Sequence, residues 1–228
     1  MRITTGTVRG GLAPVLLLAG MLTGCAQSPD DDSKTPATAH ATGAGGSAAR
    51  SGGTLGAAGS ACELPVTFDI ARDWKAKAVD TGASKGSSGS SGSDGGLAGE
   101  LADALLHQGP VTMACEIDAK PAGNIGFLRV WTGSPGNADA RSVLRSFVAA
   151  EDNTSNEKYR TFRTGGVSGV EVEYLYTSKL LDEKKTESAF AVSTPDGPVV
   201  VHLGGMDTEE HEEMLPAFEL AKRTLRVA

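Results

Sequence analysis

The stretch that decides the fold is VSGVEVEYLYT, residues 167–177. Every second position from Val170 to Tyr176 is apolar, and glutamates hold two of the positions between them. Successive side chains of a strand point to opposite faces, so this period predicts a long strand with one face buried and the other toward water. Short connections rich in glycine, at 165–166 and 196–198, predict antiparallel neighbours on both sides.

Outward from this strand, the same reading predicts further strands at 66–70, 111–117, 125–131, 159–164, 186–194 and 199–203. Apolar residues with helical spacing predict a helix over 140–148, with Asn137 as its N-cap. A last helix is expected to begin at Asp207 or Thr208, and a short one to cover 97–105. Runs of strands with tight connections, set apart from the helices, predict the α+β class: a mostly antiparallel sheet flanked by helices.

The beginning of the chain has the pattern of a lipoprotein signal peptide. Two arginines precede a short apolar run at 12–22, which closes in Leu22-Thr23-Gly24-Cys25. The run is too short to cross a hydrocarbon core about 30 Å thick, which argues against a transmembrane helix. The ending resembles the bacterial lipobox, which implies cleavage after residue 24 and a diacylglycerol on the Cys25 thiol. Two or more acyl chains anchor a protein stably, so we expect a lipid-anchored protein on the extracytoplasmic face of the cell membrane.

Composition divides the rest of the chain. Residues 25–60 carry small and polar side chains, with Leu55 the only large aliphatic one, and we interpret them as the lipidated cysteine followed by a disordered tether. Residues 61–228 then form one α+β domain, in which the Ser/Gly-rich stretch 81–96 is expected to be a flexible surface insertion.

Two further cysteines, Cys62 and Cys115, lie on either side of this insertion. An even pair in an exported protein predicts a disulfide, which would hold the leading segment against the body of the domain. Two separate buried thiols are the alternative.

The charge of the mature chain excludes some partners. Removal of residues 1–24 takes away Arg2 and Arg9 and no acidic residue, so the formal net charge moves from −7 to −9. Such a chain repels nucleic acid and anionic headgroups. We therefore expect no nucleic-acid partner, and membrane attachment through the lipid anchor alone.

Catalytic motifs match only in part. Ser155 to Lys158 fits S-x-x-K without a later K-T-G, and residues 166–170 miss the nucleophile-elbow spacing by one position. His211-Glu212 begins a zincin motif, but Leu215 stands where the second histidine belongs. His202, Asp207 and His211 are near enough in sequence to suggest a metal site. Ordinary structural roles explain the same three residues without a metal. We predict no catalytic residues, no metal and no cofactor.

Three segments carry a resemblance to a known family. They are Val66–Ile70 through Trp74, Gly126–Val130, and His211–Thr224 with its Leu215-Pro216-Ala217-Phe218. From Leu64 onward the chain resembles the actinobacterial lipoproteins of the LpqN type, which belong to the PsbP-like superfamily. The resemblance implies an antiparallel sheet between helices and a non-catalytic binding or accessory role in the cell envelope.

Four aromatic residues are candidates for lining a ligand cleft: Trp74, Trp131, Tyr174 and Tyr176. Filling the core is the alternative for each of them. We expect a non-enzymatic envelope lipoprotein that contacts a protein partner or a lipid-like ligand. The alternatives are an envelope hydrolase with an unrecognised site and a structural protein-interaction module.

Overall fold

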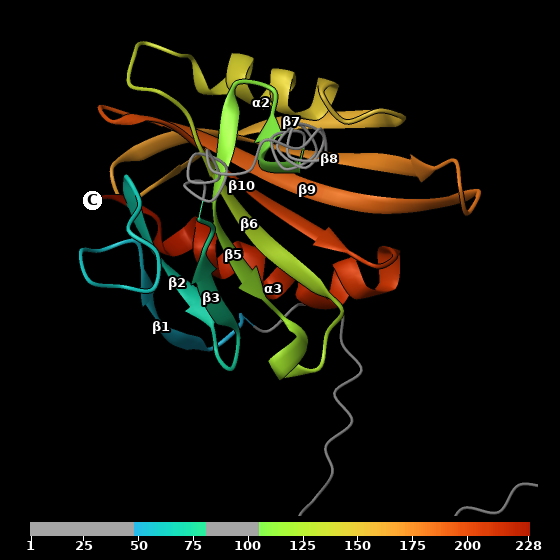
Figure 1. The fold of residues 1–228 in the computed structure, drawn as a ribbon, viewed down its shortest axis with the longest axis horizontal. Coiled ribbons are helices and arrows are strands. Elements are labelled where there is room, and N and C mark those ends of the chain that lie inside the picture. The colour runs from blue at the N-terminus through green and yellow to red at the C-terminus, as the bar shows by residue number, and fades with distance from the viewer. Residues whose placement is uncertain (1–47, 81–104) are drawn as a thin grey trace, which may run out of the picture. The chain divides into compact units, whose positions relative to one another are not determined.

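The computed structural model describes residues 48–80 and 105–228, and within them the strands form two sheets (Figure 1). The larger sheet has the order β3-β5-β6-β10-β9-β8-β7, with β4 paired to β5. Its strands are β3 (Lys75–Ala78), β4 (His107–Gln108), β5 (Val111–Asp118), β6 (Gly126–Thr132), β7 (Thr154–Thr164), β8 (Val167–Ser178), β9 (Glu183–Thr194) and β10 (Gly197–Gly205). The smaller sheet has the order β1-β2-β11, with strands β1 (Ser51–Leu55), β2 (Val66–Ala71) and β11 (Arg226–Val227).

Two α-helices cover opposite faces of the larger sheet (Figure 1). Helix α2 (Ala140–Ala149) lies on one face, and α3 (Thr208–Thr224) lies on the other, together with the smaller sheet. A short 3₁₀ helix, η2 (Lys120–Ala122), precedes β6. All the strand pairs of the two sheets are antiparallel. The predicted α+β class, a mostly antiparallel sheet flanked by helices, is confirmed.

The large sheet separates two hydrophobic cores. Val170, Val172 and Tyr174 are buried on the α2 side, where Phe147 of the helix packs edge-on against Trp131 with ring centroids 5.5 Å apart. The core on the α3 side is built around Phe68, Phe190 and Phe218. The sheet is thus apolar on both faces where helices cover it, as layered packing requires.

The helix caps agree with the prediction at one helix and differ at the other. The Asp207 carboxylate accepts a hydrogen bond from the Glu210 backbone N–H at 2.9 Å, so Asp207 is the N-cap of α3, one of the two predicted starts. At α2 the predicted cap, Asn137, is wrong. The Asp139 carboxylate accepts from the Ser142 N–H at 2.9 Å, because it stands directly before the first helical residue.

The predicted tether ends earlier than residue 60. Residues 51–55 form β1, which pairs with β2, and Leu55 is buried in the α3-side core. A polar sequence of low strand propensity becomes ordered here because β2 offers it hydrogen-bonding partners and a place for one apolar side chain. The predicted signal peptide, Cys25 and the insertion at 81–96 lie outside the described residues, as does all but the end of the helix predicted at 97–105. No helix within the described residues is long and apolar enough to cross a membrane.

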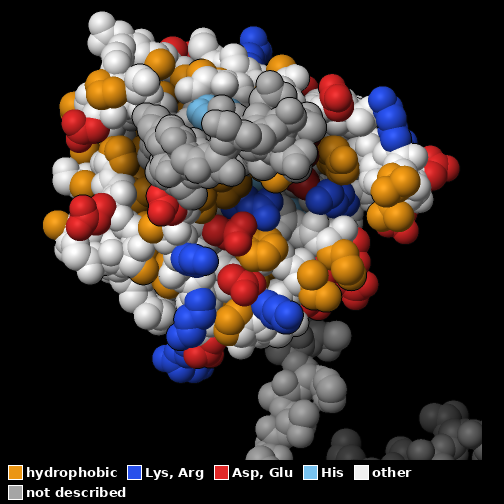
Figure 2. Space-filling view, viewed as in Figure 1, with side chains coloured by type: hydrophobic (Ala, Val, Ile, Leu, Met, Phe, Trp, Pro, Cys, Tyr) orange, Lys and Arg blue, Asp and Glu red, His pale blue; other side chains and the backbone are white. Residues whose placement is uncertain are grey.

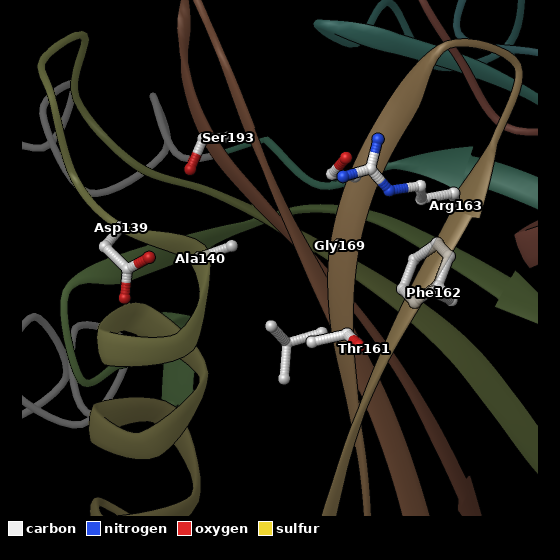
Figure 3. Close-up of a pocket in the computed structure, with 9 residues that line it drawn as sticks. Asp139, Ala140, Thr161, Phe162, Arg163, Gly169 and Ser193 are labelled. Atoms are coloured by element: carbon white, nitrogen blue, oxygen red, sulfur yellow. The ribbon is translucent and has the colours of Figure 1, made fainter.

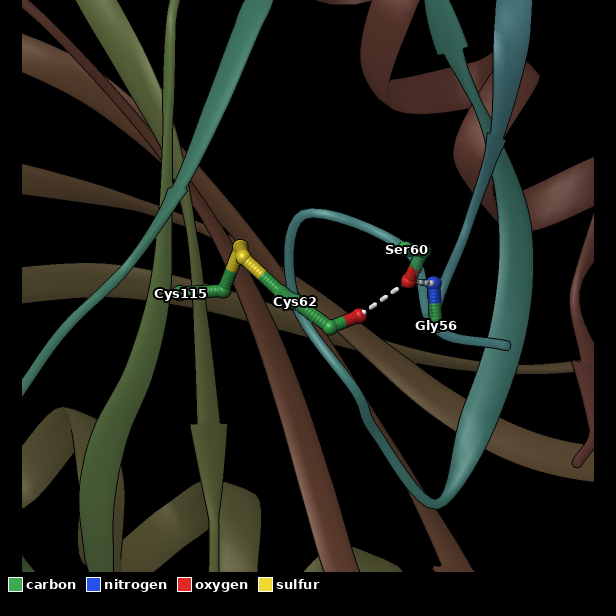
Figure 4. The surroundings of a disulfide bond; sticks show 4 residues. All are labelled: Gly56, Ser60, Cys62 and Cys115. Atoms are coloured by element: carbon green, nitrogen blue, oxygen red, sulfur yellow. Dashed lines mark hydrogen bonds between the residues drawn. A yellow bond between two sulfur atoms is a disulfide. The ribbon is translucent and has the colours of Figure 1, made fainter. Parts of the chain in front are cut away.

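A disulfide joins Cys62 and Cys115, whose Cα atoms are 6.0 Å apart (Figure 4). Cys115 lies on β5 and Cys62 in the loop between β1 and β2, so the bond ties the small sheet to the large one. Ser60 shapes this loop: its hydroxyl donates to the Cys62 carbonyl at 2.6 Å and accepts from the Gly56 N–H at 3.1 Å. The predicted pairing is present in the structure.

Candidate functional site

A cavity of about 460 Å³ opens on the α2 side of the large sheet, beyond the end of that helix. Strands β6, β8, β9 and β10 supply most of its wall, because their side chains on this face line up in register. The polar residues that line it are Gln108, Arg129, Glu151, Lys185, Glu187 and His202. The apolar lining comes from Ile125, Phe127, Trp131, Tyr176 and Met206, with Gly126, Gly204 and Gly205 between them.

Side chains on three neighbouring strands form a hydrogen-bonded network at one side of this cavity. The Nε2 atom of His202 lies 2.9 Å from Oε2 of Glu187, and both groups are almost fully buried. The Tyr174 hydroxyl lies 3.2 Å from the same Nε2 atom and 3.1 Å from the same carboxylate oxygen. It also donates to Glu151 at 2.7 Å, and Glu151 lies just after the C-cap of α2. One phenol therefore joins the two carboxyl groups and the imidazole.

A lysine completes the network on the cavity side. The Lys185 ammonium lies 2.7 Å from Oε1 of Glu187 and donates to the Gly205 carbonyl at 3.0 Å. It also lies 5.2 Å from the centroid of the Tyr176 ring. A buried carboxylate is tolerated only when it is paired and hydrogen-bonded, and Glu187 has both kinds of partner.

The two carboxyl groups differ in their electrostatics. Burial by itself raises the pKa of Glu187, but the charges and hydrogen bonds of His202 and Lys185 outweigh it and hold the pKa at about 2. The pKa of Glu151 is raised, first by burial and then by the negative charge of Glu187. Burial, with these two carboxylates close by, also raises the pKa of Tyr174. Glu187 is therefore the fixed negative charge, and Glu151 is the group whose ionisation the site opposes.

Glu151, Glu187 and His202 each offer a metal-ligand atom, and these atoms lie within 4.8 Å of one another. The donor set suits a divalent transition metal. However, all three atoms are hydrogen-bonded to the Tyr174 hydroxyl or lie within reach of it, so a phenol already occupies the space among them. The arrangement of these residues therefore fits a hydrogen-bonded network better than a metal centre.

The cavity has space for a ligand because β10 has a glycine beside the network. A Cβ atom on Gly204 would meet only the edge of the His202 ring at 3.4 Å and the Glu187 carboxylate at 4.0 Å, so a side chain there would extend into the cavity. Trp131 adds an unused donor, since its buried indole N–H has no hydrogen-bond partner among the described residues. A buried donor without a partner costs stability unless something supplies the acceptor.

A second hollow, of about 550 Å³, lies between the start of α2 and the β7–β8 hairpin (Figure 3). Asp139 and Ala140 border it on the helix side, and Phe162 and Arg163 on the other. Its polar groups serve the fold, because Asp139 caps α2 and the Ser193 hydroxyl donates to the Ala138 carbonyl at 2.7 Å. This groove is larger, but its described lining residues include no buried group of perturbed ionisation, and we take the cavity at Glu187 and His202 as the candidate site.

The four aromatic residues expected at a ligand cleft do not come together. Trp131 and Tyr176 line the cavity, and Tyr174 lies in the network beside it. Trp74 is buried in the core on the α3 side of the sheet, so for this residue the alternative, filling the core, is what the structure has. The sheet separates them because Trp74 comes from the segment between β2 and β3, which packs beneath its opposite face.

The histidines and the aspartate considered for a metal have separate roles. His202 belongs to the network, and Asp207 caps α3. His211 is buried on the other face of the sheet, where its Nε2 atom lies 3.1 Å from the Ser188 hydroxyl. This resembles the start of a catalytic pair, yet in the described part of the chain its Nδ1 atom has no partner that would orient the ring. Burial lowers the pKa of His211 to about 4.

The charged half of the site, above all Glu151, Lys185 and Glu187, was not predicted from the sequence. The signal for Glu187 was present, since it stands two positions before Ala189 and four before Ala191 and shares their buried face. A glutamate in phase with buried positions points to a buried charge. Glu151 gave no such signal, because it only approaches Glu187 once α2 is folded onto the sheet.

Comparisons with known proteins address the family and the fold. The profile of a protein family described as uncharacterised lipoprotein matches residues 32–225. No curated protein sequence gives a match. Among solved structures, the solution structure of cyanobacterial PsbP (CyanoP) from Synechocystis sp. PCC 6803 is similar, with a TM-score of 0.46 and 12% sequence identity. That similarity covers 77% of this chain and 98% of the cyanobacterial one.

Proposed function

Because the chain belongs to a family of uncharacterised lipoproteins, we propose that it is a lipid-anchored binding protein on the extracytoplasmic face of the cell membrane. The lipobox ending at Cys25 and the short apolar run before it support cleavage and lipidation at that cysteine. The disulfide supports an oxidising compartment. The proposal includes the finer affiliation with the LpqN-type lipoproteins and a role without catalysis.

The ligand of this proposal is a small amphiphile with a zwitterionic polar head, bound in the cavity. The observation that carries it is the combination of charges and apolar groups in one wall. The Arg129 guanidinium and the Glu151 carboxyl both line the cavity, and each can face a head-group charge of opposite sign. Ile125, Phe127 and Met206 offer apolar surface for the hydrocarbon part.

The energetics of Glu151 support a cationic group in the ligand. The pKa of this carboxyl is raised in the free protein because it is buried near Glu187. A ligand cation beside it would favour the ionised form and gain a charge-assisted hydrogen bond. For the negative charge of the ligand, Arg129 is a suitable partner, since its guanidinium can bind a phosphate or carboxylate. Its Nε also donates to the Glu116 carboxylate at 2.9 Å.

A titration with lysophosphatidylethanolamine below its micelle concentration tests the site. Binding is followed by the emission of Trp131, whose indole lines the cavity. We expect saturable binding to the unaltered protein and its loss in Gly204→Leu, which fills the cavity. Ser168→Leu is the matched control, because it places the same side chain in the groove of Figure 3. Loss of binding in the control with retention in Gly204→Leu would move the site to that groove.

The anchor has its own test. Cys25→Ser should release the protein from the membrane fraction of an expressing cell, while its far-UV circular dichroism stays that of the folded domain. Metabolic labelling with palmitate should mark the unaltered chain and leave the variant unlabelled. A variant that keeps both the label and the membrane association would refute lipidation at Cys25.

A further inference from the structure

The hairpin of β8 and β9 projects beyond the rest of the sheet (Figure 1). The two strands pair with each other as far as Ser178 and Glu183. The pairing of β7 with β8 ends at Tyr176, and that of β10 with β9 ends at Ser188. In the described part of the chain, the hairpin therefore has no other strand beside it from residue 177 to 184. At about 3.4 Å per residue, its tip extends about 10 Å past its last neighbour.

Two adjacent leucines stand at this tip. Leu180 is 93% exposed and Leu181 is 65% exposed. The turn that carries them is ordered: the Leu181 N–H donates to the Ser178 hydroxyl at 3.3 Å, and Asp182 adopts a left-handed backbone conformation with φ of 52°. Single exposed apolar residues are common on protein surfaces, but a neighbouring pair on a projecting tip is a feature of contact sites. Figure 2 shows hydrophobic side chains next to charged ones at the edge where this hairpin lies.

We propose that this tip, with Leu180 and Leu181 leading, inserts into the lipid bilayer that holds the anchor. The inference rests on the lipid anchor of the proposed function. Residues 26–47 separate Cys25 from the described domain, and their contour length is at most about 75 Å, so the domain stays within reach of the bilayer surface. Each fully buried leucine favours transfer from water by roughly tenfold or more. Two leucines are too few to hold a protein alone, but they can orient one that is already anchored.

The charges at the tip suit a bilayer interface better than the rest of the protein does. Without residues 1–24 the chain has a formal net charge of −9, which opposes approach to anionic lipids. Residues 178–184 differ, because Lys179 and Lys184 balance the two acidic residues Asp182 and Glu183. Lysine side chains can bury their methylene groups and keep the ammonium among the headgroups.

Insertion of the tip would bring the cavity close to the headgroups. Tyr176 and Lys185, at the base of the hairpin, both line the cavity. Two further residues of the cavity wall, Ile125 and Met206, are apolar and more than half exposed. The Met206 backbone N–H donates to the Ile125 carbonyl at 3.1 Å, which holds them side by side. An amphiphile leaving the bilayer would thus meet apolar side chains before it reached the polar network.

The test uses the full, lipidated protein reconstituted into phosphatidylcholine vesicles with brominated acyl chains, which quench nearby tryptophan. Leu180→Trp places the probe at the tip, and Val227→Trp is the control, because the C-terminus lies at the opposite side of the domain (Figure 1). Both positions are exposed, and native Trp74 and Trp131 are buried, so the unaltered protein provides the background emission. Flotation of the vesicles reports anchoring independently.

We expect all three proteins to float with the vesicles and only Leu180→Trp to be blue-shifted and strongly quenched. Flotation with equal, weak quenching of both probes would overturn the insertion of the tip, leave the anchor intact, and assign the leucines to a protein partner instead. Failure of all three to float would refute the anchor itself, and the inference with it.

Discussion

The buried imidazole of His211 should make the stability of this protein depend on pH, in a way that one substitution removes. Burial lowers the pKa of His211 to about 4, and the charges of His202 and Lys185 lower it further, against opposite contributions from Glu187 and Glu173. In the unfolded chain the pKa returns to about 6.5. Between these two values the unfolded state binds more protons than the native state, so stability rises with pH.

The magnitude follows from the shift. If only the unfolded state were protonated, the free energy of unfolding would fall by about 3 kcal/mol. Between pH 7.5 and pH 5 it falls by about 2 kcal/mol. The perturbation is the double variant His211→Phe with Ser188→Ala, which replaces a hydrogen-bonded pair by two apolar groups and leaves no hydroxyl without a partner. Urea unfolding at the two pH values measures the free energy of unfolding. The double variant should lose about 2 kcal/mol less than the unaltered protein on acidification.

Ser188→Ala alone is the matched control. It removes the hydrogen bond to Nε2 but keeps the imidazole buried, and burial is the leading cause of the lowered pKa. The pH dependence should therefore persist in this variant. If the double variant loses as much stability on acidification as the unaltered protein, the histidine is not buried in its neutral form and the reasoning fails.

Three further outcomes can be measured by the same unfolding assay at neutral pH. Cys62→Ala with Cys115→Ala should lower stability by about 4 kcal/mol on the chain-entropy estimate for a sequence separation of 53, and reduction of the unaltered protein should reproduce the loss. Phe147→Ala should cost about 3–5 kcal/mol, because the ring is fully buried between α2 and the sheet. Glu151→Gln should stabilise the free protein, because the pKa of this carboxyl is raised and its ionisation at neutral pH opposes folding.

The sheet could be predicted from the sequence because its signals are local. The alternation in β8, the two glycines that follow β7 and the glycine that begins β10 are local signals, and the structure has strands and turns there. The same is true of the start of α3, where Asp207 caps the helix. Strand β1 was missed because its order comes from pairing with β2, which lies across a loop, and from a single buried side chain, Leu55.

The candidate site was harder to predict because it is assembled from distant segments. Tyr174 was expected near a ligand on account of its aromatic ring, but the structure uses its hydroxyl, which meets Glu151 and His202 from two other elements. Those contacts depend on the order β10-β9-β8 in the sheet and on the placement of α2 across it. A sequence pattern gives the strands but not their order. Trp74 illustrates the converse, since its aromatic ring suited a cleft, but the segment between β2 and β3 places it in the core on the α3 side.

Glu151 is the residue that favours a binding site over a buried network that serves only the fold. Glu187 has a lysine, an imidazole and a phenol as partners, so its burial is compensated within the fold. Among the described residues, Glu151 accepts only the Tyr174 hydroxyl and faces the negative charge of Glu187. A glutamine could keep that hydrogen bond without the repulsion, so the carboxyl brings the free fold a cost and no evident gain. A cationic group in the cavity would reverse that balance, because it would pair with a carboxyl that has no ion-pair partner among the described residues.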